Sequence, residues 1–225
     1  MATAKPKPKK KGAVAAARKK QPPWLWIGVA GLVLVLAVAA IVSGGGSGDG
    51  DDDVAGLEQT RPVSISGTAL PELPQSGTDP AVGQVIPEAT GQSFDGSPVA
   101  IRNDGRAKLI VFVAHWCPHC QKEIPLLADW LKSNQLPSGV DLYTVSTGVA
   151  SNRPNFPPSS WLKEEGWTAP TLADSEEGQA ADGYGLSAFP YFVAVDGAGK
   201  VVARTTGEIT TGQFEDLARK ALGNR

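Results

Sequence analysis

The sequence predicts an α/β fold: a central mixed β-sheet flanked by helices, preceded by a single transmembrane helix. Three observations support this prediction. An apolar run at 109–114 leads directly into a helical pattern at 118–131, the turn sequence 196–199 joins two apolar strands, and residues 24–42 carry no charge. The predicted order strand, helix, strand, inserted helix, helix, strand, strand, helix is typical of a mixed sheet with helices on its faces.

The N-terminal residues predict one membrane span. Residues 1–23 form a basic tail with eight Lys and Arg residues and no acid. The uncharged segment 24–42 would extend about 28 Å as a helix, which matches the hydrocarbon core of a bilayer. Trp24 and Trp26 lie where aromatic residues meet the membrane interface. By the positive-inside rule the tail is cytoplasmic, the span contacts lipid, and the rest of the chain lies outside the cytoplasmic membrane.

Two other readings of this region remain. A cleaved signal peptide would use the small residues 37–39, although its apolar core would exceed the usual length of about 7–15 residues. A basic tail can also bind nucleic acid, but beside a membrane span it is explained as a topology signal. We therefore expect no nucleic-acid partner.

A change in composition divides the remainder of the chain. Residues 43–80 are rich in Gly, Ser, Asp and Pro and are predicted to be a flexible linker. Residues 81–225 are long enough to bury a core as one domain.

Local patterns predict the elements of this domain in order. Residues 94–101 are typical of a strand pair around an Asp-Gly turn. The continuous apolar run 109–114 indicates a buried strand. Pro118 suits the first turn of the next helix, and Pro125 lies in its interior, where it should produce a kink. The later elements are strands at 140–146, 171–173, 191–195 and 200–204, a loop at 147–159, and helices at 161–165 (capped by Ser160), 176–181 and 213–222.

The two cysteines of the chain, Cys117 and Cys120, form a C-x-x-C pair where the apolar strand meets the helix. Thiol–disulfide exchange centres have this arrangement. A disulfide within one chain must join these two residues, and so short a loop adds little stability. The pair therefore indicates a redox centre, whose disulfide makes a diffusible cofactor unnecessary.

An ordered set of motifs resembles the thioredoxin-fold superfamily. The set comprises Trp116-Cys117-Pro118-His119-Cys120, Pro125 five residues later, and Phe189-Pro190 before a β-hairpin. The segments 83–99 and 120–125, with extra residues after the second core strand, are similar to the membrane-anchored bacterial TlpA/ResA branch with its redoxin-like domain. The resemblance implies a thioredoxin-like fold and a bacterial cell-membrane location.

Two positions depart from the thioredoxin pattern. Val111 stands where thioredoxin has a buried aspartate, and Pro118-His119 is the dipeptide of the oxidising DsbA group. The direction of electron flow therefore remains open between a reductase, such as one acting in cytochrome c maturation, and an oxidase.

The catalytic residues follow from helix physics and from the resemblance. A helix N-terminus stabilises the Cys117 thiolate, and Cys120 would resolve the mixed disulfide. His119 can donate a hydrogen bond to the thiolate, or lie in solvent without influence. The resemblance implies that Glu123 takes the proton of Cys120; the alternative is a solvated glutamate near Lys122 and Lys132.

Substrate contacts are expected on one side of Cys117. The resemblance implies a cis peptide bond before Pro190, with the backbone of Phe189 directed toward a bound peptide. Trp116 would shield the sulfur, and Pro118 would lie on the same surface. His115 is interpreted as a residue at the rim, although Cys117, Cys120, His115 and His119 also have the chemistry of zinc ligands.

We therefore predict a membrane-anchored, extracytoplasmic thiol:disulfide oxidoreductase. Its partners would be exported proteins with cysteines and a membrane redox protein that resets the cysteine pair. Two alternatives remain: a non-catalytic binding module, and a thiol peroxidase with one reactive cysteine.

Overall fold

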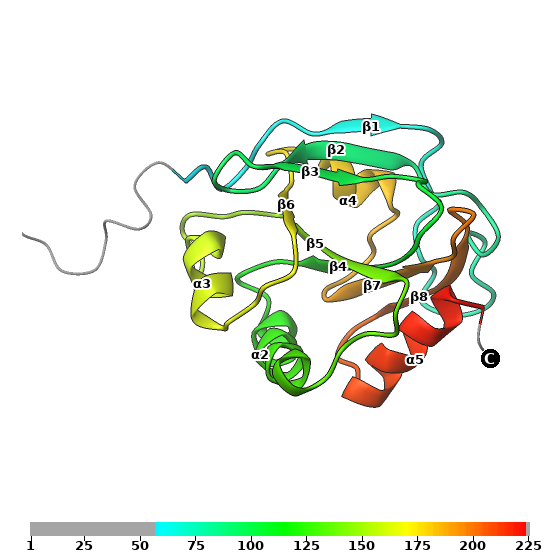
Figure 1. The fold of residues 1–225 in the computed structure, drawn as a ribbon. Helices are drawn as coiled ribbons and strands as arrows, with labels where there is room; N and C mark the ends of the chain where they lie inside the picture. The colour runs from blue at the N-terminus through cyan, green and yellow to red at the C-terminus, as the bar shows by residue number, and fades with distance from the viewer. Residues whose placement is uncertain (1–56, 224–225) are drawn as a thin grey trace, which may run out of the picture. The chain divides into compact units, whose positions relative to one another are not determined.

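The computed structural model describes residues 57–223, which contain two β-sheets and four helices (Figure 1). The larger sheet has the strand order β6-β5-β4-β7-β8; β4, β5 and β6 are parallel, while β7 and β8 are antiparallel to their neighbours. The smaller sheet is antiparallel, in the order β1-β2-β3. The strands are β1 (Ser64–Ser66), β2 (Glu88–Gln92), β3 (Pro98–Ile101), β4 (Ala107–Val113), β5 (Val140–Ser146), β6 (Thr171–Ala173), β7 (Tyr191–Val195) and β8 (Val201–Thr206).

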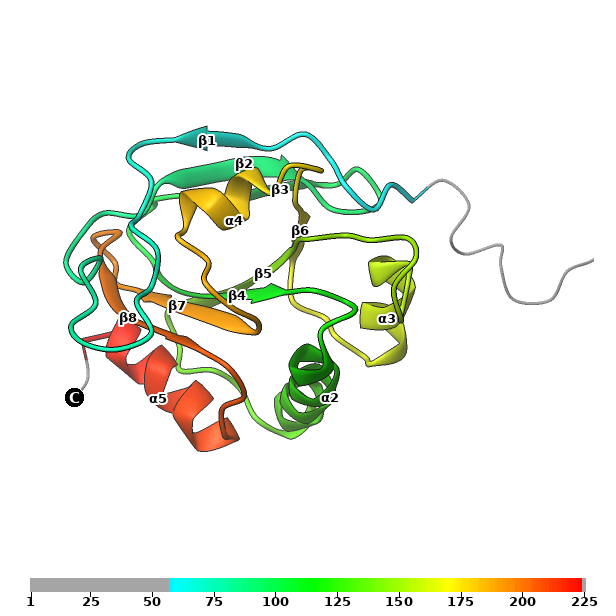
Figure 2. The same cartoon turned by 180° about the vertical axis from the view of Figure 1, so that it is seen from behind.

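Different elements cover the two faces of the larger sheet (Figures 1 and 2). Helices α2 (Pro118–Ser133) and α5 (Thr211–Ala221) lie on one face, where α3 (Pro158–Glu164) adds to the same apolar cluster. The smaller sheet and α4 (Gln179–Gly183) contribute to the cluster on the opposite face. The predicted α/β fold with a mixed sheet and an insertion after the second core strand is confirmed, because α3, β6 and α4 lie between β5 and β7.

Strand β4 is the centre of this arrangement, and all seven of its residues are buried. Leu109 and Val111 point into the cluster under α2 and α5, whereas Ile110 and Phe112 point into the opposite cluster. Burial on both faces explains why the strand is a continuous apolar run rather than an alternating one. Its C-terminal end carries the chain directly to the C-x-x-C pair.

Helix α2 begins where the sequence predicts. Cys117 is its N-cap in extended conformation, and Pro118 is the first helical residue, where a missing N–H is tolerated. Pro125 lies inside the helix as predicted. Helix α5 has a capping box in which Thr210 and Gln213 satisfy each other's backbone N–H groups.

Most element boundaries lie within two residues of the prediction, and three elements differ more. Helix α3 begins at Pro158, with Pro157 as its N-cap, and not after Ser160. A proline at the first helical position is tolerated because its missing N–H would have no partner there. Helix α4 begins at Gln179 rather than 176, after Gly178 in a left-handed conformation. The predicted strand pair 94–101 is a hairpin in which β2 lies earlier, at Glu88–Gln92.

Residues 57–80, which were predicted to belong to the flexible linker, are folded against the domain. They contain β1, which pairs with β2, and the buried side chains of Val63 and Leu70. The backbone N–H of Leu70 donates to Gly183 at 2.9 Å. The buried residues are few and lie among prolines, serines and glycines, so composition alone does not reveal them. The predicted linker is therefore too long at its C-terminal end.

The predicted basic tail 1–23, the predicted span 24–42 and the first part of the linker lie outside the described residues. Within 57–223 no helix is both long enough and apolar enough to cross a bilayer.

Candidate active site

Cys117 and Cys120 differ sharply in their surroundings, although both thiols are free in the structure. Cys117 caps α2 and retains a small exposed surface of 6%. As N-cap it lies beside the unpaired N–H groups and the positive dipole end of the helix, which favour a thiolate. Cys120, one turn later, is fully buried. The geometry therefore makes Cys117 the thiol that an incoming disulfide can reach.

The pKa of the Cys120 thiol lies well above its ordinary value. Burial is the largest cause, because it disfavours the charged thiolate. A hydrogen bond with the backbone of Ala114 lowers the pKa, whereas negative charge on Cys117 and Glu123 raises it further. Cys120 therefore keeps its proton until a base removes it.

The Phe189–Pro190 loop faces the reactive cysteine. The peptide bond before Pro190 is cis, as predicted. The Cys117 thiol donates to the Phe189 carbonyl with an Sγ–O distance of 3.9 Å. The hydroxyl of Thr206 holds this loop by donating to the carbonyls of Ala188 and Pro190. Backbone groups beside a nucleophile are suited to bind an extended peptide, as the sequence predicts for Phe189 and Pro190.

Trp116 lies between this loop and the segment after β5. Its indole N–H donates to the Gly148 carbonyl at 2.7 Å, and its ring meets that of Phe189 edge to face at 5.8 Å. Gly148 has a φ of 63°, and a Cβ there would contact both rings. Trp116 is half-buried beside Cys117, whereas Pro118 is exposed on the helix terminus. Contact of Trp116 and Pro118 with a client stays a prediction.

Glu123 is buried, so the alternative of a solvated helix glutamate is wrong. The side chain is 1% exposed, on the same buried face of α2 as Cys120. Oε2 accepts from the backbone N–H of Ile209 at 3.1 Å, whereas Oε1 has no hydrogen-bond partner. Burial raises the pKa of Glu123 to about 7, with a further contribution from the charge of Glu208, against the Ile209 hydrogen bond. A carboxyl group of this kind can accept or release a proton near neutral pH.

His119 forms a different contact from the predicted one. Its side chain is exposed, and Nδ1 lies 2.6 Å from Glu208 Oε1. Glu208 also contacts Lys122 at 3.3 Å, and both hydrogen bonds lower the pKa of the Glu208 carboxyl. Among the contacts of the described residues, His119 makes no hydrogen bond with Cys117. An influence of His119 on the thiolate stays a prediction.

His115 is buried, not at the rim as predicted. Nδ1 lies 2.7 Å from the Pro154 carbonyl, and the Ala150 backbone N–H donates to Nε2 at 3.2 Å. Both ring nitrogens are thus engaged by the backbone, which disagrees with the zinc hypothesis. In residues 57–223 no group of three or more His, Cys, Asp and Glu side chains is arranged to hold a metal ion.

Sequence reasoning missed the roles of Gly148, His115 and Ile209. Each contacts a residue 32 to 86 positions away, so no local spacing reveals the pairing. The one available signal was His115 itself, a polar residue at the end of a fully apolar strand.

Comparisons with known proteins agree with this geometry. The Redoxin family model matches residues 81–221. The thiol:disulfide interchange protein DsbE homolog of Paracoccus denitrificans is 31% identical over 68% of this chain and 80% of its own length. The thiol-disulfide oxidoreductase ResA of Bacillus subtilis is 28% identical over 50% of this chain and 59% of its own. A thioredoxin-family thiol:disulfide interchange protein of Chlorobium tepidum shares the fold, with a TM-score of 0.50 and 24% identity over 63% of this chain and 97% of its own.

Proposed function

Because the chain belongs to the Redoxin family, we propose that it is a membrane-anchored thiol:disulfide oxidoreductase that exchanges disulfides with cysteines of exported proteins. The observation that carries the exchange activity is the asymmetry of the pair: Cys117 at the helix N-terminus beside Phe189, and Cys120 buried behind it. The charge pattern of residues 1–42 supports the membrane anchor and the extracytoplasmic location.

The first step is attack by the Cys117 thiolate. It displaces one sulfur of a client disulfide, so that a bond forms between Cys117 and the client and a client thiolate leaves. Backbone groups of the Phe189–Pro190 loop and the Trp116 ring position the client segment beside Cys117. Because a thiolate is required, the stabilisation provided by the N-terminus of α2 determines how much of Cys117 is reactive.

The second step resolves this mixed disulfide. The Glu123 carboxylate accepts the proton of Cys120, whose own pKa is raised by burial. The Cys120 thiolate then attacks Cys117 Sγ, which releases the second client sulfur as a thiolate and leaves a Cys117–Cys120 disulfide. Two electrons have passed to the client and remain there, and a membrane redox partner supplies two others that reduce the Cys117–Cys120 disulfide.

The same steps in reverse would oxidise a client dithiol. The direction is set by the reduction potential of the pair, about −270 mV for a thioredoxin-like reductant and about −120 mV for a DsbA-like oxidant. Equilibration of the reduced protein in glutathione buffers measures this potential directly.

Trapping of the mixed disulfide tests the exchange activity. With Cys120→Ser, a disulfide-containing client should accumulate as a covalent adduct that a reducing agent releases, because no second thiol can displace it. With Cys117→Ser, no adduct should form and no turnover should be measured, since the remaining thiol, that of Cys120, is buried and protonated. Mass spectrometry of the reaction mixture detects both results.

The trapping result also separates the proposal from its alternatives. Unchanged client binding by Cys117→Ser, with no adduct from Cys120→Ser, would indicate a non-catalytic binding module. Sustained peroxide turnover by Cys120→Ser would indicate a peroxidase. Either outcome would overturn the proposed function.

A further inference from the structure

The segment between β5 and α3 forms a wall on one side of Cys117. It begins at Gly148, whose carbonyl accepts from the Trp116 indole and whose Cα lies close to the rings of Trp116 and Phe189. Farther along, Phe156 lies at 6.0 Å from the ring of His115. His115 and Trp116, which directly precede the C-x-x-C pair, thus hold this segment against the site. We call residues 148–156 the flanking loop.

His115 fixes the middle of the flanking loop. A backbone N–H can only donate, so the hydrogen bond from Ala150 identifies Nε2 as an acceptor and places the ring proton on Nδ1, which donates to Pro154. The ring is neutral in this arrangement, and burial lowers the pKa of His115. The His115 carbonyl also accepts from the side chain of Asn155. Three hydrogen bonds of His115 and one of Trp116 therefore join the flanking loop to the residues that precede Cys117.

Arg153 is the one charged residue of the flanking loop. Its guanidinium carbon lies 5.1 Å from the centre of the Trp116 ring, a cation–π contact that directs the group along the surface beside Cys117. The side chain is exposed, and it forms no ion pair with any carboxylate in the described part of the chain. Its five N–H donors are thus available to a partner.

The basic residues at the start of α2 differ from Arg153, because they have a carboxylate partner. His119 and Lys122 both contact Glu208. Arg153 is therefore a cation without a carboxylate partner, in contact with the Trp116 ring next to Cys117. This difference gives the surface around Trp116 a preference for negative charge.

We infer that Arg153 and Trp116 form a subsite for client segments that carry a carboxylate side chain next to the reactive cysteine. The inference rests on the proposed exchange activity and names its substrate class. A guanidinium binds a carboxylate through two parallel hydrogen bonds, and the Trp116 ring restricts its orientation before the client arrives. The subsite adds affinity for acidic clients and disfavours lysine or arginine at the same place.

Three disulfide peptides of equal length test the inference, with Glu, Gln or Lys beside the cysteine that is attacked. The readout is the second-order rate of oxidation of the reduced protein at low ionic strength, followed by tryptophan fluorescence or by quenched mass spectrometry. We expect the Glu peptide to react about fivefold faster than the Lys peptide, as for an exposed ion pair, and the difference to shrink at high salt.

Substitutions at Arg153 should change this preference. Arg153→Gln should remove the difference between the Glu and Lys peptides and Arg153→Glu should invert it, with each rate taken relative to that of the Gln peptide for the same variant. Arg102 is an exposed arginine outside the site, and Arg102→Gln is the matched control that should keep the wild-type preference.

The outcomes separate this inference from the proposed function. Reaction with all three peptides at equal rates, or an Arg153→Glu variant that keeps the wild-type preference, would overturn the acidic subsite and leave the exchange activity intact. No reaction with any peptide would instead overturn the exchange activity itself.

Discussion

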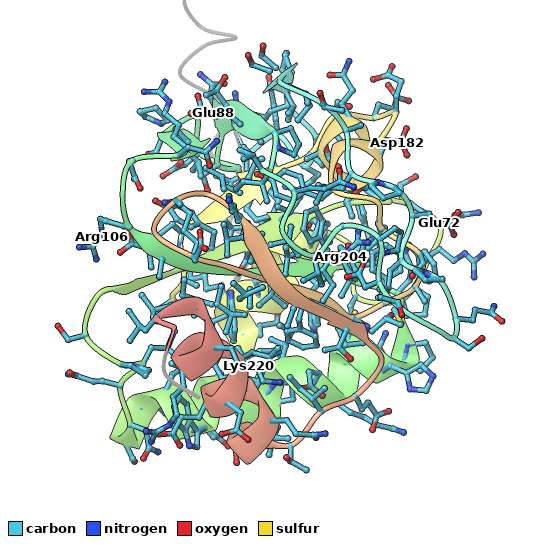
Figure 3. All side chains as sticks on the ribbon, turned by 90° about the vertical axis from the view of Figure 1, so that its right-hand side faces the viewer. Glu72, Glu88, Arg106, Asp182, Arg204 and Lys220 are labelled. Atoms are coloured by element: carbon cyan, nitrogen blue, oxygen red, sulfur yellow. The ribbon has the colours of Figure 1, made fainter. Side chains whose placement is uncertain are left out.

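Each face of the larger sheet buries an ionisable side chain, Arg204 on one and Glu123 on the other, and the two differ in how completely they are hydrogen-bonded. On the face covered by the smaller sheet, the fully buried side chain of Arg204 on β8 lies beside the segment that precedes β2 (Figure 3). Its guanidinium pairs with Asp79 and donates to the Pro71 and Tyr184 carbonyls and to the Tyr191 hydroxyl. On the helical face, Glu123 keeps one carboxylate oxygen without any partner.

The contrast separates groups that maintain the fold from a group suited to chemistry. A buried polar group with all its partners costs little and becomes costly only when one partner is removed. A buried carboxylate with a free oxygen destabilises its own charged form, and its pKa moves toward neutrality. A buried ionisable side chain thus stabilises the fold on one face, where Arg204 has all its partners, and can accept a proton on the other, where Glu123 does not. We call Arg204 and its partners the clamp.

The clamp at Arg204 should produce the largest stability effect. Asp79→Ala leaves a buried guanidinium without its counter-charge, which we expect to cost about 3–5 kcal/mol in the free energy of unfolding. The exposed pair of Asp129 and Lys132 provides the matched control, and Asp129→Ala should cost less than about 1 kcal/mol. Urea denaturation of residues 57–225 measures both. Equal costs for the two variants would show that the buried pair is not a clamp.

A substitution at Glu123 should change the rate of disulfide exchange more than the stability of the fold. Glu123→Gln keeps an acceptor for the Ile209 N–H but removes the base, so resolution of a mixed disulfide should slow by about a hundredfold near pH 8. In the wild type this rate should rise through pH 7 as Glu123 ionises, and the variant should lack that inflection. Stopped-flow measurement of client release gives the rate. Glu215→Gln, at a partly exposed position of α5 where the glutamate pairs with Arg219, is the control with unchanged kinetics.

The same variant should show a smaller, pH-dependent change in stability. Because the folded pKa of about 7 exceeds the ordinary 4.5, the folded protein retains a proton between these values that the unfolded chain releases. The Glu123 contribution therefore destabilises the fold increasingly from pH 4.5 to 7. Glu123→Gln should match the wild type near pH 4.5 and exceed its stability at pH 8. A gain independent of pH would contradict this sign.

The sequence was sufficient for the features that depend on neighbouring residues. The apolar run before Cys117 predicted β4, Pro118 predicted the start of α2, and the family pattern predicted the cis bond at Pro190. Glu123, which the resemblance implied, lies three residues after Cys120, and both are buried residues of α2. Each of these follows from a local period or from a motif with fixed spacing.

Features that depend on long-range contacts could not be predicted in this way. His115 is bonded by backbone groups 35 and 39 residues away, and Glu123 Oε2 accepts from the backbone N–H of Ile209, 86 residues away. Residues 57–80 have the composition of a linker, because they contain few buried residues and several prolines between them. Their place in the fold comes from Arg204, more than a hundred positions later.

The titration of Glu123 tests the central claim most directly. In reduced protein labelled with ¹³C at the glutamate carboxyl carbons, the Glu123 signal can be assigned by its absence from Glu123→Gln. We predict a midpoint near pH 7 for this signal. A Glu123 midpoint near 4.5 would contradict its role as the acceptor of the Cys120 proton.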